Sequence, residues 1–161
     1  MTGMLSQAGI PILQIDAFAG EPFTGNPAAV CLPDVEPPAD WMQQIAAEMN
    51  LSETAFTWPR GDSYGLRWFT PVAEVDLCGH ATLATAFALW EVGRVNCDDN
   101  ISFATRSGVL EVRREQNMIK MNFPAEPATF CESPNGLAEA LGAEILWGGK
   151  NRRDHRVQGA N

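Results

Sequence analysis

The segment Val75–Thr82 (VDLCGHAT) contains the residue types best suited to chemistry. It leads into an apolar run with helical character, which places Cys78, Gly79 and His80 at a helix N-terminus. Unpaired amides and the positive end of the helix dipole favour a carboxylate there, and a glycine lets a ligand approach the backbone. The same field is expected to lower the pKa of the Cys78 thiol. A small core cysteine and a histidine that caps amides fit these residues as well.

A second candidate is Glu53, in the segment Asn50–Phe56 (NLSETAF). It starts an apolar strand directly after a polar turn, and its neighbours Leu51 and Ala55 are apolar. Partial desolvation raises the pKa of a carboxyl group toward values useful for moving protons. A capping or edge glutamate in water fits the same pattern, so both interpretations stay open.

Cofactor and metal motifs are absent from the sequence. Gly25-Asn26-Pro27 predicts a tight turn, and neither GxGxxG nor GxxxxGK occurs in the chain, which argues against dinucleotide redox chemistry and nucleotide hydrolysis. The four cysteines form no CxxC pair and the histidines are His80 and His155, so no zinc-ligand spacing is present. We therefore expect neither a cofactor nor a metal.

The elements that must position these residues form an α+β pattern. Strands succeed one another directly between residues 101 and 123, which favours antiparallel hairpins over crossover units. Ala81–Trp90 is apolar or small on every side, as in a helix buried all round. We predict a curled, barrel-like antiparallel sheet around this central helix. Strands are expected at Pro11–Phe18, Ala28–Leu32, Glu53–Trp58, Tyr64–Thr70, Ile101–Thr105, Val109–Arg113 and Met118–Phe123, and helices at Pro37–Asn50, Gly79–Glu91 and Ser133–Leu141.

Length and charge limit the classes of partner. A chain of 161 residues is long enough for one well-cored domain, and its net charge of −9 argues against nucleic acid or an anionic membrane as the main ligand. The longest apolar stretch is far shorter than the roughly 20 residues that span a bilayer. Met1–Gly9 lacks a secretory signal pattern, so we expect a soluble, cytoplasmic protein.

The basic residues gather at the end of the chain. Residues 150–161 contain Lys150, Arg152, Arg153 and Arg156, and we predict a flexible, solvated basic tail there. A basic arm for nucleic acid is the alternative interpretation of this segment.

Four segments, in order over about residues 12–150, together carry a family resemblance. They resemble the PhzF family of phenazine biosynthesis-like proteins, which is related to diaminopimelate epimerase and proline racemase. The matching segments are IDAFAGEPFTGNPAAV (residues 15–30), AAEMNLSETAF (46–56), RWFTPVAEVDLCGHATLATA (67–86) and FATRSGVLEV (103–112).

The resemblance implies a fold of two similar halves, with the site between them and proton transfer without cofactor or metal. It implies that Glu53 is the acid/base and that Cys78 matches a catalytic thiol of the epimerases and racemases. The motifs alone leave open which of the two removes the proton, and we favour Glu53 because NLSETAF is PhzF-like. The implied substrate-binding residues are Asn26, Asp76, Gly79, His80 and Ala81.

The resemblance covers only the N-terminal half of the family fold. We expect residues 1–149 to form one PhzF-like domain, residues 150–161 to be a tail, and the second family domain to be absent, as if the chain were cut short. The expected function is a cofactor-independent isomerase or epimerase that acts on a small carboxylate-bearing substrate and regains a cleft as a homodimer. The alternative is a truncated, inactive half-domain that binds a small carboxylate or a partner chain.

Overall fold

The computed structural model of the chain describes residues 9–21, 24–116, 118–152 and 154–159. The expectations for the start of the N-terminus, for part of the turn around residues 20–27 and for part of the basic tail lie outside these residues. The chain divides into two compact units, residues 1–123 and 124–161.

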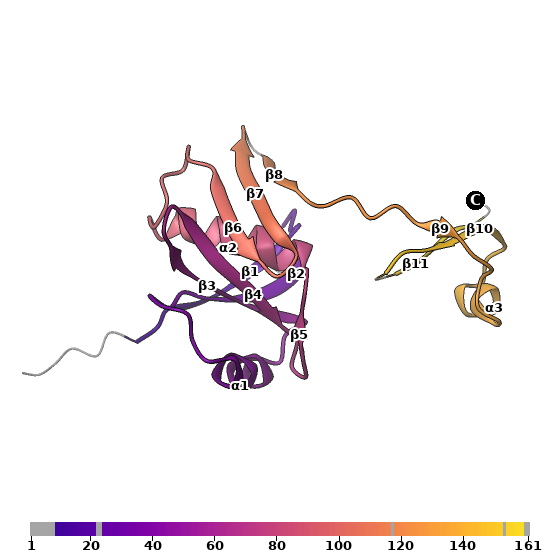
Figure 1. The fold of residues 1–161 in the computed structure, drawn as a ribbon, viewed down its shortest axis with the longest axis horizontal. Helices are drawn as coiled ribbons and strands as arrows, with labels where there is room; N and C mark the ends of the chain where they lie inside the picture. Colours follow the sequence, from indigo (N-terminus) through magenta and orange to yellow (C-terminus); the bar gives the residue numbers. More distant parts are fainter. Residues whose placement is uncertain (1–8, 22–23, 117, 153, 160–161) are drawn as a thin grey trace, which may run out of the picture. The chain divides into compact units, whose positions relative to one another are not determined.

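The first unit is built on one mixed sheet that curls around a helix (Figure 1). Its strands run in the order β1-β2-β3-β4-β6-β7-β8, and the short β5 pairs with β4. The strands are β1 (Ile12–Ala17), β2 (Asn26–Cys31), β3 (Glu53–Arg60), β4 (Ser63–Phe69), β5 (Glu74–Val75), β6 (Ile101–Thr105), β7 (Gly108–Glu115) and β8 (Met118–Asn122). The predicted α+β fold class is confirmed.

Two strand pairs are parallel, although the sequence predicted antiparallel hairpins. β2 runs parallel to β3, and β4 runs parallel to β6, while the other pairs are antiparallel. Each parallel pair is joined by a connection that contains a helix, α1 (Ala39–Met49) for the first and α2 (Gly79–Glu91) for the second. A crossover of this length carries the chain back to the start of the next strand, so that it runs in the same direction.

Helix α2 is the core of the first unit, as its apolar sequence predicted. Eight of its thirteen residues are buried, and it contacts β1, β2 and β3. Four of the buried residues are alanines, whose small side chains let the strands approach closely. Leu89 and Trp90 are the large side chains of the helix that are buried. The two buried threonines, Thr82 and Thr85, donate their hydroxyls to the carbonyls of Cys78 and Ala81, both at 2.6 Å. These bonds remove the cost of burying polar groups.

Helix α1 packs on the opposite face of the sheet. Its buried residues Met42 and Ala46 meet Phe56 and Phe69, whereas Ala55, the neighbour of Phe56 on β3, packs with α2. Successive side chains of a strand point to opposite faces, so β3 is covered on both sides. This burial holds the first residue of β3, Glu53, in a fixed place.

The second unit is a three-stranded antiparallel sheet with a short helix. The strands are β9 (Thr129–Phe130), β10 (Ile145–Lys150) and β11 (His155–Gly159), in the order β11-β10-β9, and the helix is α3 (Leu137–Leu141). The predicted start of a helix at Ser133 is wrong, since α3 begins after Gly136, whose backbone is left-handed.

The end of the chain also differs from the expected flexible tail. The predicted boundary between residues 149 and 150 falls at the end of β10, and residues 155–159 pair with β10. Asn151 closes the turn between the two strands. Its side-chain oxygen accepts a hydrogen bond from the backbone amide of Asp154 at 2.7 Å. A polar turn between two short strands resembles a solvated terminus when only composition and charge are considered. Among the described residues, no helix has the length and apolar character needed to cross a lipid bilayer.

Candidate functional site

Three segments meet where the parallel strands β2 and β3 begin. Residue 28 of β2 lies opposite Glu53 of β3, so Asn26 and Glu53 belong to the same end of the sheet. The chain enters β3 from α1 through Asn50, which is left-handed (φ 52°) and donates its amide to the Ala46 carbonyl at 3.1 Å. This tight cap ends α1 three residues before Glu53. The N-terminus of α2 reaches the same place, which the contacts of His80 establish.

His80 is the centre of a small polar cluster. Its Nε2 atom lies 3.4 Å from Oε2 of Glu53 and 3.3 Å from Oγ of Ser52, and its Nδ1 atom lies 3.4 Å from Sγ of Cys78. Ser52 in turn lies within donor distance of Oδ1 of Asn26, at 3.4 Å. We call Glu53, Cys78 and His80, together with Ser52, the His80 cluster. Glu53 and the start of α2, predicted separately as candidates, thus come together.

The cluster is shielded from most water at Glu53, Cys78 and His80, but it is open at Ser52, which is exposed. The side chains of His80 and Glu53 are 10% and 20% exposed, and Cys78 is 8% exposed. A carboxylate that faces an imidazole with little water around it can exchange protons with a bound molecule, because few solvent molecules compete for the contact.

The prediction of a low thiol pKa at Cys78 is wrong. Burial raises the pKa of Cys78 to about 12, and the negative charge of Glu53 adds to the rise. The nearby amides of Ala81 and His80 lower it only in part. The helix terminus lowers the pKa of the thiol, but desolvation raises it, and desolvation is the larger effect here. At neutral pH the thiol keeps its proton.

Glu53, Cys78 and His80 also have the donor types found in metal sites. Each offers one ligand atom, and these atoms lie within 4.8 Å of one another. However, the two imidazole nitrogens face different partners, Nδ1 the thiol and Nε2 the carboxylate. A single ion takes only one nitrogen from an imidazole ring, so the arrangement is that of a hydrogen-bonded chain.

The other predicted site residues lie around the cluster in different ways. Asn26 is exposed and joins the cluster through Ser52. Gly79 leaves room beside the helix terminus, since an added Cβ would meet only the ring of Phe123, at 4.0 Å. Ala81 is fully buried, and its backbone amide faces Cys78.

Asp76 is the predicted residue that the structure does not bring into the cluster. It is exposed, and its backbone carbonyl accepts a hydrogen bond from Oγ of Ser107 at 2.7 Å. Among the described residues, the contacts of the cluster do not include its carboxylate. Conversely, Ser52 belongs to the cluster but was not predicted, although it stands directly before Glu53 in the NLSE motif.

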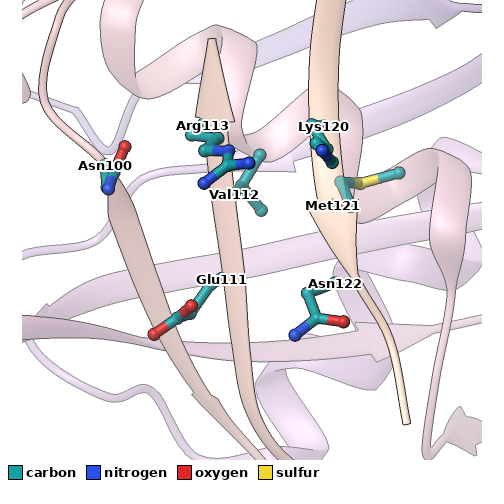
Figure 2. A pocket seen from close by; sticks show the side chains of 7 residues that line it. All are labelled: Asn100, Glu111, Val112, Arg113, Lys120, Met121 and Asn122. Carbon is teal, nitrogen blue, oxygen red and sulfur yellow. The ribbon is translucent and has the colours of Figure 1, made fainter. Parts of the chain in front are cut away.

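A cavity of about 270 Å³ lies elsewhere in the first unit, along β7 and β8 (Figure 2). None of the predicted site residues lines it. Its two cations, Arg113 and Lys120, share one carboxylate, that of Glu115, at 2.6 and 3.6 Å. Its lining residues are Asn100, Glu111, Val112, Arg113, Lys120, Met121 and Asn122.

Two curated proteins to which the chain is similar are both named as isomerases. It is 48% identical over 149 residues to an uncharacterized isomerase of Halalkalibacterium halodurans, covering 92% of this chain and 56% of the relative. It is 54% identical over 143 residues to an uncharacterized isomerase of Pseudomonas aeruginosa, covering 85% of this chain and 54% of the relative. The chain therefore spans about half the length of the curated relatives it matches.

A solved structure agrees with these relatives. The crystal structure of a phenazine biosynthesis protein of the PhzF family from Enterococcus faecalis matches with a TM-score of 0.81 and 43% sequence identity, over 92% of this chain and 56% of that one. Residues 15–150 match the family of phenazine biosynthesis-like proteins, PhzC-PhzF. These residues include the whole His80 cluster. The chain belongs to the phenazine biosynthesis-like (PhzC-PhzF) family.

Proposed function

We propose that the chain supplies the acid/base half of a cofactor-independent isomerase or epimerase. The observation that carries this proposal is the contact of Glu53 with His80 at the N-terminus of α2, which joins a proton-transfer group to a helix end that favours carboxylates. The names of the relatives, two uncharacterized isomerases, support the same kind of reaction.

In the proposed reaction Glu53 moves a proton on the substrate. The ionised carboxylate takes a proton from a carbon that is acidified by a neighbouring carboxylate or carbonyl group, and the carboxylic acid returns the proton to another carbon or to the other face. Atoms and charge balance without an oxidant or a cofactor. The backbone amide of Gly79 at the start of α2 would bind the substrate carboxylate, since those of His80 and Ala81 face Cys78. Asn26 would contact the substrate at the rim.

Cys78 has a different proposed part. Because burial raises its pKa to about 12, it carries a proton at neutral pH, which favours Glu53 over Cys78 as the base. It serves as a weak hydrogen-bond donor to His80, and Glu53 is the base of this half.

The proposed substrate is a small carboxylate, and a second copy of the chain is the proposed partner that completes the cleft, in the cytoplasm. The one-sided opening of the cluster favours a partner, since an active site closed from water needs a second wall. The alternative is a half-domain that binds a carboxylate without turnover.

Solvent exchange tests the reaction. The protein is incubated in deuterium oxide with hydroxyanthranilate-like and amino-acid substrates, and deuterium on carbon is measured by mass spectrometry. We expect incorporation above that of the Glu53→Gln variant, which keeps the shape of the side chain but not the base. Equal incorporation by both proteins would leave the inactive half-domain as the explanation.

Sedimentation equilibrium tests the proposed dimer. We expect a mass twice that of one chain at concentrations at which exchange occurs. A monomer that still exchanges deuterium would remove the second copy from the mechanism, and a monomer without exchange would support the inactive half-domain.

A further inference from the structure

Ser52 lies between His80 and the start of β2. Its Oγ atom is 3.3 Å from Nε2 of His80, 3.4 Å from Oδ1 of Asn26 and 3.5 Å from the carbonyl oxygen of Pro27. The side chain therefore touches a group of the proposed acid/base machinery on one side and the turn into β2 on the other.

The partners of Ser52 fix the direction of its hydrogen bonds. A hydroxyl has one proton, and the Pro27 carbonyl can only accept it. The amide oxygen of Asn26 is an acceptor on the same side. With its proton directed there, Oγ of Ser52 faces His80 with lone pairs and accepts a hydrogen bond from the Nε2–H group.

Glu53 also faces Nε2 of His80 with an acceptor. An ionised carboxylate only accepts hydrogen bonds, and Oε2 of Glu53 lies 3.4 Å from the same Nε2 atom. Two acceptors thus face Nε2, which requires a proton on that nitrogen.

Cys78 completes the pattern on the other side of the ring. Its Sγ atom lies 3.4 Å from Nδ1. Burial keeps this thiol protonated, so it donates, and Nδ1 must then be the nitrogen without a proton. One tautomer of neutral His80 satisfies its three neighbours, Ser52, Glu53 and Cys78.

We propose that Ser52 is a positioning residue that holds neutral His80 as the Nε2–H tautomer, so that one imidazole links the Cys78 thiol to the Glu53 carboxylate. The catalytic consequence rests on the proposed function: a donor on Nε2 stabilises Glu53 as the ionised base, and an acceptor on Nδ1 holds the thiol in its protonated form. Ser52 thereby helps to decide which of the two groups acts as the base.

Nitrogen-15 NMR of the imidazole tests the tautomer directly, without a substrate. The chain has two histidines, so the His155→Gln variant of the full chain gives the signals of His80 alone. At a pH at which the imidazole is neutral, we expect one nitrogen signal typical of N–H, assigned to Nε2, and one typical of a bare nitrogen, assigned to Nδ1. In the added Ser52→Ala variant the two signals should move toward each other, as the tautomers mix, and Ser52→Thr should restore the separation.

The matched control is Ser63→Ala. Ser63 also donates its hydroxyl to a backbone carbonyl, that of Arg60 at 3.0 Å, but it belongs to the turn between β3 and β4. It should leave the His80 signals unchanged.

Two results would overturn the proposal. One is a proton on Nδ1 in the protein with Ser52 intact, which needs no second variant and does not depend on the folding of Ser52→Ala. The other is a folded Ser52→Ala variant with unchanged His80 signals. Neither result depends on deuterium exchange, so failure of the tautomer and failure of the proposed function are distinguishable.

Discussion

Two titratable side chains contact the same imidazole, and their surroundings separate their proposed roles. Glu53 is partly open to water, whereas Cys78 is buried and has a pKa of about 12. The sequence predicted both residues as candidates, and it placed Cys78 at a helix N-terminus. It could not predict the protonation of the thiol, because the balance between helix amides and desolvation depends on neighbours that only the fold supplies.

The first prediction ranks the two groups. Glu53→Gln should lower the deuterium exchange rate by about 10²- to 10⁴-fold, the usual loss when a general acid/base is removed. Cys78→Ser should lower it less, because a serine hydroxyl can donate to Nδ1 of His80 as the thiol does. Rates are measured with the same substrate for both variants, with the tertiary structure checked by near-UV circular dichroism. The reverse order would assign the base to Cys78.

At the scale of elements, the pattern of apolar residues predicted the bounds of α2 and the approximate positions of the strands. The uniformly apolar or small residues of Ala81–Trp90 predicted a buried helix, and the structure has α2 at Gly79–Glu91. The parallel pairing of β2 with β3 was not predictable in the same way. Strand direction depends on how the intervening helix crosses the sheet, and α1 looks the same in sequence whichever strand follows it. Yet this pairing is what brings Asn26 and Glu53 to one end of the sheet.

A core substitution tests the role of α2. Leu89 is fully buried, and Leu89→Ala should lower the free energy of unfolding by about 2–5 kcal/mol, through lost burial and the cavity left behind. Val109→Ala on β7, where the side chain is 66% exposed, should change it by no more than about 0.5 kcal/mol. Urea denaturation followed by tryptophan fluorescence measures both. Similar losses for the two variants would mean that α2 is not the centre of the core.

At the scale of the whole molecule, two thiols make stability depend on pH in the alkaline range. Burial raises the pKa of Cys31 to about 11 and that of Cys78 to about 12, from an ordinary value of 9.0. Above pH 9 the unfolded chain loses these protons while the folded chain keeps them. The unfolded state then binds fewer protons, so stability falls as pH rises.

This gives the third prediction. Each thiol should contribute a fall of about 1.4 kcal/mol per pH unit between pH 9 and its folded pKa. Cys78→Ser should show a shallower fall in the free energy of unfolding than Cys97→Ser, since Cys97 is an exposed cysteine. Denaturation in urea from pH 8 to 11 in the presence of a reductant gives the comparison. Parallel curves for the two variants would show that Cys78 is not shielded from water.

The described members of the His80 cluster come from a short stretch of the chain. All lie between residues 52 and 80, and their partner Asn26 lies in the same unit. During synthesis, all residues of the His80 cluster are therefore added before the second unit begins. A substitution in the second unit therefore leaves every residue of the cluster unchanged.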